Sequence, residues 1–196
     1  MPEEVASRRS RITPEREAEL HGAVLDLLGE VGYEALTMDA VAARTKSSKA
    51  TLYRQWGSKP ELVAKALRCT QPVSLREIDT GSVRGDFALM VEHSDDAQMA
   101  KDTALMRGLA HAVHESPELH QALRDLLVDP ELNGLQMMLQ RGVERGEIAP
   151  DCPALDFVPH MLLGAFIALP LIEDRTVDRT FLGQFLDAVV FPALGV

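Results

Sequence analysis

The chain has 196 residues, of which 46% are hydrophobic and 26% are charged, and its formal net charge is −10 at pH 7. These values indicate a folded protein of one or two domains with a real core, and they exclude a largely disordered chain. The longest apolar run without charge, residues 161–172, is well short of the ~20 residues that a membrane helix needs. Residues 1–19 are too charged for a signal peptide, so we expect a cytoplasmic protein.

Charge is distributed unevenly along the chain. Residues 1–70 hold 11 Lys and Arg against 10 Asp and Glu, whereas residues 71–196 hold 9 against 20. An acidic total is compatible with nucleic-acid binding when the cations cluster. Arg8, Arg9 and Arg11 form a basic arm over residues 1–12. This arm is either a solvated tail or a segment that contacts phosphates or the minor groove.

The first predicted helix begins at Thr13-Pro14, a capping residue followed by proline in the first turn. Apolar residues then repeat at helical spacing from Leu20 to Val31, and Gly32 ends the pattern.

Residues 37–56 have the pattern of two short helices separated by a polar turn. Thr37 is placed to cap the first helix and Ser48 to cap the second, in which Leu52 and Trp56 point inward because they are four residues apart. This is the outline of a helix-turn-helix, which reads base edges with the N-terminal residues of its second helix.

The motif assigns a DNA-contact role to residues on and around the second helix. Those expected nearest the groove are Ser48, Lys49, Thr51 and Tyr53, and those expected nearer the phosphates are Thr37, Arg54, Gln55 and Lys59, with Ser47 and small Ala50 on the same surface. A further helix opens at the capping box from Ser58 to Glu61.

The remainder of the chain also reads as helix. A stretch rich in turn-forming residues, 71–85, marks a domain boundary, and apolar stripes at helical spacing follow it as far as Phe191. No stretch alternates like a strand for long, so the predicted fold class is all-α.

The ordered string formed by residues 30–37, 41–44 and 48–59 resembles the N-terminal domain of the TetR/AcrR family of transcriptional regulators. The resemblance covers about residues 14–68. The family usually has glycine in the turn, where this chain has Lys46, and a left-handed backbone there costs a lysine roughly 1 kcal/mol. We therefore expect a turn of slightly different shape.

The resemblance implies a two-domain protein. A helix-turn-helix domain of three or four helices would occupy residues 13–72, and a C-terminal helical domain for effector binding and dimerisation would occupy residues 73–196. The family generally dimerises through its two C-terminal helices, which are also rich in apolar residues here. The expected interface residues are Phe157, Leu162, Phe166, Leu169, Phe181, Phe185 and Val189. The alternative is that these side chains complete the domain core.

Effector binding in this family takes place in a cavity among the C-terminal helices. Flexible methionine and aromatic side chains suit such a cavity, although ordinary core packing is the leading explanation for any single methionine. The candidate lining residues are Met90, Met106, Leu109, Val113, Met138, Met161 and Phe166.

No residues with the spacing of a catalytic or metal site stand out. His111, His114 and His120 lie close together but lack a metalloprotease spacing, and Cys69 and Cys152 are read as buried or free thiols. We expect no enzyme activity, no metal and no cofactor.

The sequence thus predicts a homodimeric DNA-binding regulator, a repressor released from a palindromic operator by a small molecule. The alternatives are a dimeric helical ligand-binding protein or enzyme without a specific operator, and a scaffold that carries the DNA-binding head to another protein.

Overall fold

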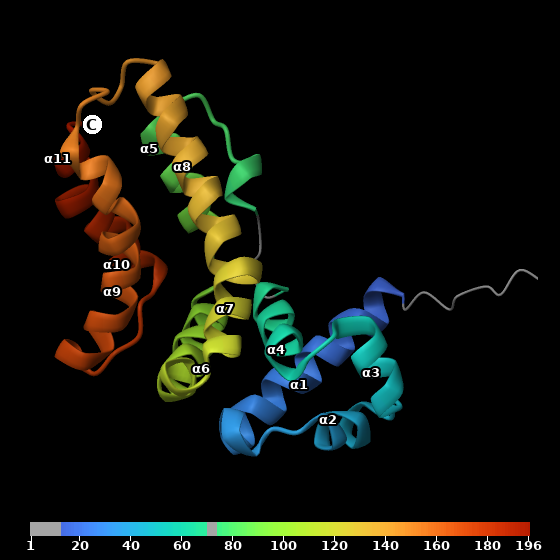
Figure 1. Cartoon of the computed structure of the whole chain (residues 1–196). Coiled ribbons are helices and arrows are strands. Elements are labelled where there is room, and N and C mark those ends of the chain that lie inside the picture. The colour runs from blue at the N-terminus through green and yellow to red at the C-terminus, as the bar shows by residue number, and fades with distance from the viewer. Residues whose placement is uncertain (1–12, 70–73) are drawn as a thin grey trace, which may run out of the picture.

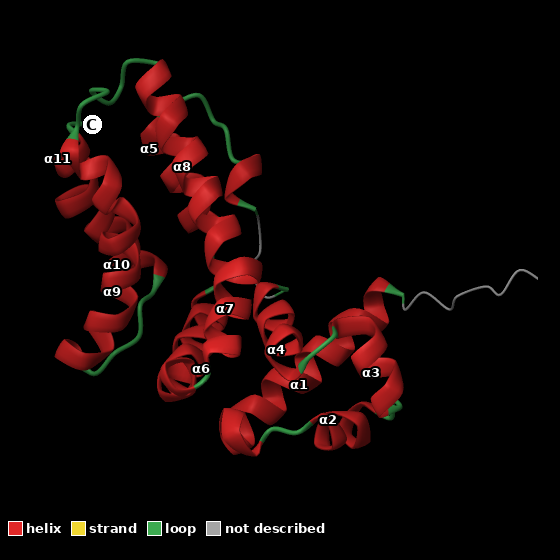
Figure 2. Ribbon diagram, viewed as in Figure 1, coloured by secondary structure: helices red, strands yellow, loops and turns green. Residues whose placement is uncertain are grey.

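The structure is a computed structural model that describes residues 13–69 and 74–196. Every regular element in these two ranges is helical (Figures 1 and 2). The α-helices are α1 (Pro14–Ala35), α2 (Met38–Thr45), α3 (Lys49–Trp56), α4 (Lys59–Arg68), α5 (Val83–Glu92), α6 (Asp96–Glu115), α7 (Pro117–Leu123), α8 (Asp129–Glu144), α9 (Val158–Glu173), α10 (Arg179–Phe185) and α11 (Phe191–Leu194). Short 3-10 or π turns are η1 (Leu75–Glu77), η2 (Arg124–Val128), η3 (Pro153–Phe157) and η4 (Leu186–Val190).

Side-chain hydroxyls begin the first four helices, as the sequence predicts. Each hydroxyl accepts a hydrogen bond from the backbone N–H three residues later, at 3.3 Å for Thr13, 3.1 Å for Thr37, 3.0 Å for Ser48 and 3.3 Å for Ser58. These bonds satisfy donors that have no partner within the helix, so the local sequence fixes where each helix starts.

Helix α1 contains a break at Gly32, whose backbone is left-handed with φ +74°. The expectation that the helix ends there is correct for its regular part. One further turn follows the break, and the N–H of Leu36 bonds to the carbonyls of Gly32 and Tyr33.

The buried side chains form two separate cores. The first contains the interior of α1–α4 together with residues contributed by three later helices, namely Leu109, Ala112, Leu119, Leu123 and Leu127. The second joins α5, α8, α9, α10 and α11. Figure 1 shows α6 and α7 lying beside α1 and α4. The first core therefore crosses the domain boundary predicted at 71–85.

A polar cluster ties the segment after this boundary to the end of α8. The carboxylate of Asp86 is fully buried and accepts hydrogen bonds from the N–H and hydroxyl of Thr80, at 2.6 and 2.7 Å. The guanidinium of Arg145 lies 3.5 Å from the other Asp86 oxygen. Glu147 in turn accepts a bond from the N–H of Val83, at 2.7 Å. These contacts set the start of α5 against α8.

The helix formed by η3 and α9 corrects one expectation from sequence. Pro153–Glu173 is long and apolar enough, by length and composition alone, to cross a membrane, and 17% of its apolar window is buried. The charge-free run of residues 161–172 underestimates the length of this helix. The helix begins earlier, at Pro153, and it continues through Pro170. One such helix is weak evidence for a membrane protein, and its exposed apolar face requires a different explanation.

His21 lies in the first core with only 3% of its surface exposed. Neither ring nitrogen has a hydrogen-bond partner among residues 13–69 and 74–196, and the ring meets Trp56 edge to face at a centroid distance of 5.8 Å. Burial is the main cause that lowers the pKa of His21; the carboxylate of Glu17 opposes this effect and Lys65 adds to it. The folded state therefore favours the neutral ring.

This burial predicts a pH-dependent loss of stability. As pH falls below about 6.5, the unfolded chain takes up a proton at His21 before the folded chain does, so the free energy of unfolding decreases until the lowered folded pKa is passed. We expect the decrease between pH 7.5 and 5.5, measured by urea unfolding, to be smaller in His21→Phe than in the wild type. His114→Gln, at an exposed histidine, is the control and should retain the full decrease. An equal decrease in His21→Phe would contradict the assignment.

Candidate nucleic-acid interface

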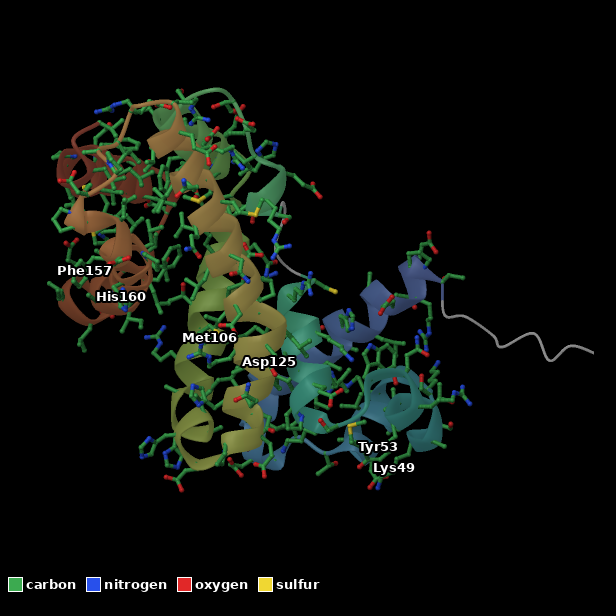
Figure 3. All side chains as sticks on the ribbon, turned by 45° about the horizontal axis from the view of Figure 1, so that its top comes forward. Lys49, Tyr53, Met106, Asp125, Phe157 and His160 are labelled. Carbon is green, nitrogen blue, oxygen red and sulfur yellow. The ribbon has the colours of Figure 1, made fainter. Side chains whose placement is uncertain are left out.

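Helices α2 and α3 form the predicted helix-turn-helix, and two buried side chains fix the rotation of α3. Leu52 and Trp56 point into the first core with 1% of each residue exposed. Lys49, Ala50 and Tyr53 lie on the opposite, exposed side. Figure 3 shows Lys49 and Tyr53 projecting outward from this part of the molecule. Burial of Leu52 and Trp56 thus leaves the opposite side of α3 exposed to solvent.

The turn between the two helices is built by Lys46. Its φ is 52° and its ψ is 36°, the left-handed conformation that favours glycine. The N–H of Lys46 bonds to the carbonyl of Ala43 at 3.4 Å, and the N–H of Ser47 bonds to that of Ala42 at 3.0 Å. These two bonds make a Schellman motif, the usual end of a helix before a left-handed residue. The lysine therefore adopts the backbone conformation that a glycine would have.

The hydroxyl groups predicted at the interface are largely engaged in local bonds. The Ser48 hydroxyl accepts from the Thr51 N–H and lies 2.8 Å from the Thr51 hydroxyl. Thr37 caps α2, and the Ser47 hydroxyl donates to the carbonyl of Thr45 at 3.4 Å. These groups shape the helix ends, and the other polar side chains that α3 exposes are Lys49, Tyr53, Arg54 and Gln55.

The cations near the turn differ in their partners. The ammonium of Lys49 lies 2.8 Å from a carboxylate oxygen of Asp39, on α2. Lys46 and Arg54 have no ion-pair partner among the described residues. Sequence patterns did not reveal the Asp39 contact, because it depends on how α2 and α3 cross.

Lys59 is partly buried and is held against the end of α1. Its ammonium donates to the carbonyl of Tyr33 at 2.6 Å and lies 4.0 Å from the centre of the Tyr33 ring. Burial lowers the pKa of Lys59, and the nearby carboxylate of Glu34 opposes that effect. In this structure Lys59 joins the start of α4 to the end of α1, whereas its predicted place near the phosphates would require it to leave Tyr33.

The predicted effector-pocket residues are not gathered at one place. Leu109 and Val113 belong to the first core, Met106 is exposed, and the other four pack in the second core: Met90, Met138, Met161 and Phe166. The structure does contain an open groove of about 610 Å³, lined by polar residues of α8 together with Arg76 and Met137. None of the predicted pocket residues lines it.

The predicted interface residues also divide. Leu169 is only 4% exposed and packs in the second core, and four others are partly buried against that core: Leu162, Phe166, Phe181 and Phe185. Phe157 and Val189 are exposed as expected. The most exposed large apolar side chains on α9 are not among the residues predicted at the interface: Leu163, Ile167, Leu171 and Ile172. Helix α9 is apolar on every side, so spacing alone does not separate its outer face from its inner face.

Other candidate residues have simple settings. Cys69 is exposed and Cys152 is partly buried, and both are free thiols. Among residues 13–69 and 74–196, no three His, Cys, Asp or Glu side chains are grouped so that they could hold a metal ion. The basic arm, with Arg8, Arg9 and Arg11, lies outside the described residues.

Comparison with known families covers most of the chain. Residues 22–66 match the family described as bacterial regulatory proteins, tetR family. Residues 77–189 match the family described as tetracyclin repressor-like, C-terminal domain. The two matches lie on either side of the segment that the structure does not describe.

Similar proteins agree with these matches. An uncharacterised HTH-type transcriptional regulator of Mycobacterium tuberculosis is 34% identical over 180 residues, which span 91% of this chain and 88% of that protein. A protein of Mycobacteroides abscessus named DNA-binding transcriptional repressor TetR is 31% identical, over 89% of this chain and 92% of its own.

A solved TetR-family transcription regulator, SCO0332, superposes with a TM-score of 0.63 at 28% identity, over 93% of this chain and 98% of its own. The flavonoid-responsive regulator FrrA has the same fold, with a TM-score of 0.65 at 22% identity over 93% and 97% of the two chains. The family matches, the relatives and the helix-turn-helix geometry lead to one conclusion: the chain belongs to the TetR family of DNA-binding transcriptional regulators.

Proposed function

We propose that this regulator binds a palindromic operator as a homodimer in the cytoplasm and represses transcription by occupying promoter DNA. The observation that carries the proposal is α3, where buried Leu52 and Trp56 hold Lys49 and Tyr53 toward solvent. The name of the Mycobacteroides relative, a repressor, supports the sign of regulation. In a dimer, two such helices enter major grooves one turn apart, about 34 to 36 Å, and read a palindrome.

Replacing either outward side chain of α3 tests the placement of the recognition helix. We expect Tyr53→Ala or Lys49→Ala to weaken binding to the operator by roughly 1 to 3 kcal/mol, because contacts to base edges are lost. The measurement is fluorescence anisotropy with duplexes tiled across the DNA that flanks the regulator's own gene. Lys101→Ala, at an exposed lysine of α6, is the control and should bind like the wild type.

Two results would contradict this proposal in different ways. If both folded α3 variants bound the operator as tightly as the wild type, the recognition helix would be misplaced. If the wild type distinguished no duplex from any other, the chain would be a helical dimer without a specific operator.

We also propose that the outer face of α9 is the centre of the dimer interface. Its exposed side chains Leu163, Ile167, Leu171 and Ile172 form an apolar surface on a protein whose relatives are DNA-binding regulators. Contiguous apolar surface of this kind marks a contact with another protein or with a membrane. A second copy of the chain would cover it through a two-fold axis, with Phe157 and Val189 at its margins.

A charge on this face tests the dimer in the full chain. Ile167, with 65% of its surface exposed, has room for a substitution without disturbing the protomer core. We expect Ile167→Asp to sediment as a monomer at concentrations where the wild type is a dimer, because two carboxylates would be buried together. Val31→Asp, at an exposed apolar residue of α1, is the control and should remain dimeric. A dimeric Ile167→Asp would move the interface elsewhere.

A small-molecule effector is the third part of the proposal. The ligand would bind the C-terminal helices and release DNA only by favouring a geometry in which the two recognition helices are wrongly spaced. Coupling of this kind is typically about 1 to 3 kcal/mol, or 5- to 150-fold in affinity.

Thermodynamic reciprocity tests the effector. A compound selected because it raises the unfolding temperature of the full chain is titrated calorimetrically with and without operator DNA. We expect the operator to weaken the compound by the same factor by which the compound weakens the operator. A compound whose affinity is the same with and without operator DNA would not be an inducer.

A further inference from the structure

The two helices of the helix-turn-helix are joined by an ion pair on the exposed surface. Asp39 lies in the first turn of α2, Lys49 is the first residue of α3, and their charged atoms are 2.8 Å apart. Both side chains are open to solvent, with 72% of Asp39 and 48% of Lys49 exposed. The hydrogen bond from the ammonium to Asp39 raises the pKa of Lys49, so the lysine is charged throughout the physiological range.

The ion pair engages Lys49 and not the other cations of the turn and α3. The turn and α3 carry three cations, Lys46, Lys49 and Arg54, and Lys49 alone has an ion-pair partner among the described residues. Its position at the start of α3 is where a recognition helix contacts base edges. Asp39 therefore neutralises Lys49, the cation expected nearest the bases, whereas Lys46 and Arg54 have no ion-pair partner among the described residues.

The DNA-binding head, residues 13–69, has no net charge, so each cation that can reach phosphate matters for binding. Residues 13–69 hold 8 Lys and Arg and 8 Asp and Glu, so they supply no net positive field of their own. Binding to any duplex, irrespective of sequence, comes from cations that displace counterions from phosphates. A lysine that already neutralises a carboxylate contributes little to that term, and the carboxylate itself repels phosphate.

Base edges include hydrogen-bond donors for the Asp39 carboxylate, whereas phosphates are acceptors only. A carboxylate accepts hydrogen bonds from the amino group of cytosine, and a lysine donates to the acceptors of guanine, so a matching base pair step is able to satisfy both members of the pair. Because an exposed ion pair is only weakly stable, such a step can replace it.

We propose that Asp39 is a specificity-determining residue that withholds Lys49 from non-specific phosphates and leaves it available to the operator. The inference rests on the proposed operator binding and adds to it a penalty against other DNA. Asp39 also favours the start of α2 through its charge, a purely structural role that would not change the salt dependence of DNA binding.

The test is Asp39→Asn in the full chain, which removes the charge and keeps the shape. Anisotropy titrations with the operator and with a scrambled duplex of the same composition are run between about 50 and 200 mM salt. On scrambled DNA we expect tighter binding and a slope of log K against log salt that is steeper by about 0.9 for each protomer, since one more lysine meets phosphate. Operator binding should gain less, so the specificity ratio falls several-fold.

Two controls separate this effect from a change in net charge. Glu173→Gln alters the net charge equally at an exposed pair with Arg175, at the end of α9, and should leave slope and ratio unchanged. Asp39→Asn in a Lys49→Met background should leave the slope of the Lys49→Met protein unchanged. An equal steepening in that background would overturn the inference, because Asp39 would then act without Lys49.

Lys49→Met by itself tests the same idea without altering Asp39. It should weaken operator binding and leave the slope on scrambled DNA as in the wild type; a slope shallower by about 0.9 for each protomer would overturn the inference. If the wild type discriminates the operator but Asp39→Asn has unchanged slope and ratio, only this inference fails. A wild type that does not discriminate at all refutes the proposed operator binding instead.

Discussion

The structure depends on the apolar contact between the DNA-binding head and helices α6, α7 and η2. Leu109, Leu119, Leu123 and Leu127 are buried in the same core as the interior of α1 and α4. Burial of each such side chain contributes about 1.5 to 3 kcal/mol, so the head is held by packing rather than by the short segment that leads from it. The orientation of α3 is consequently set in part by residues more than fifty positions further along the chain.

Within the head, packing and charge have separate tasks. Leu52 and Trp56 fix the rotation of α3, and the hydroxyls of Thr37 and Ser48 fix the ends of the two short helices. The positive and negative side chains of residues 13–69 balance, and half of them form ion pairs with one another, as Arg44 does with Glu30. The small number of free cations means that contacts with bases would carry a larger share of the binding free energy than in a strongly basic domain.

Local features of the fold could be predicted from the sequence, and long-range ones could not. Capping by Thr37 or Ser48 involves residues three positions apart, and the inward direction of Leu52 and Trp56 follows from helical spacing. The pairing of Asp39 with Lys49 and the burial of Asp86 depend on how helices cross, which no local pattern encodes. On α9, which is apolar all round, only the folded arrangement distinguishes buried Leu169 from its exposed neighbours.

Lys46 links two properties of the protein at a single position. Its left-handed backbone makes glycine the more stable choice by roughly 1 kcal/mol, yet glycine would also remove a cation beside α3 that has no ion-pair partner among the described residues. Folding stability and attraction to DNA therefore change in opposite directions there. Selection for a more stable head would favour glycine, whereas selection for attraction to DNA would retain the lysine. The residue at this turn therefore indicates which of the two properties is under stronger selection in a given regulator.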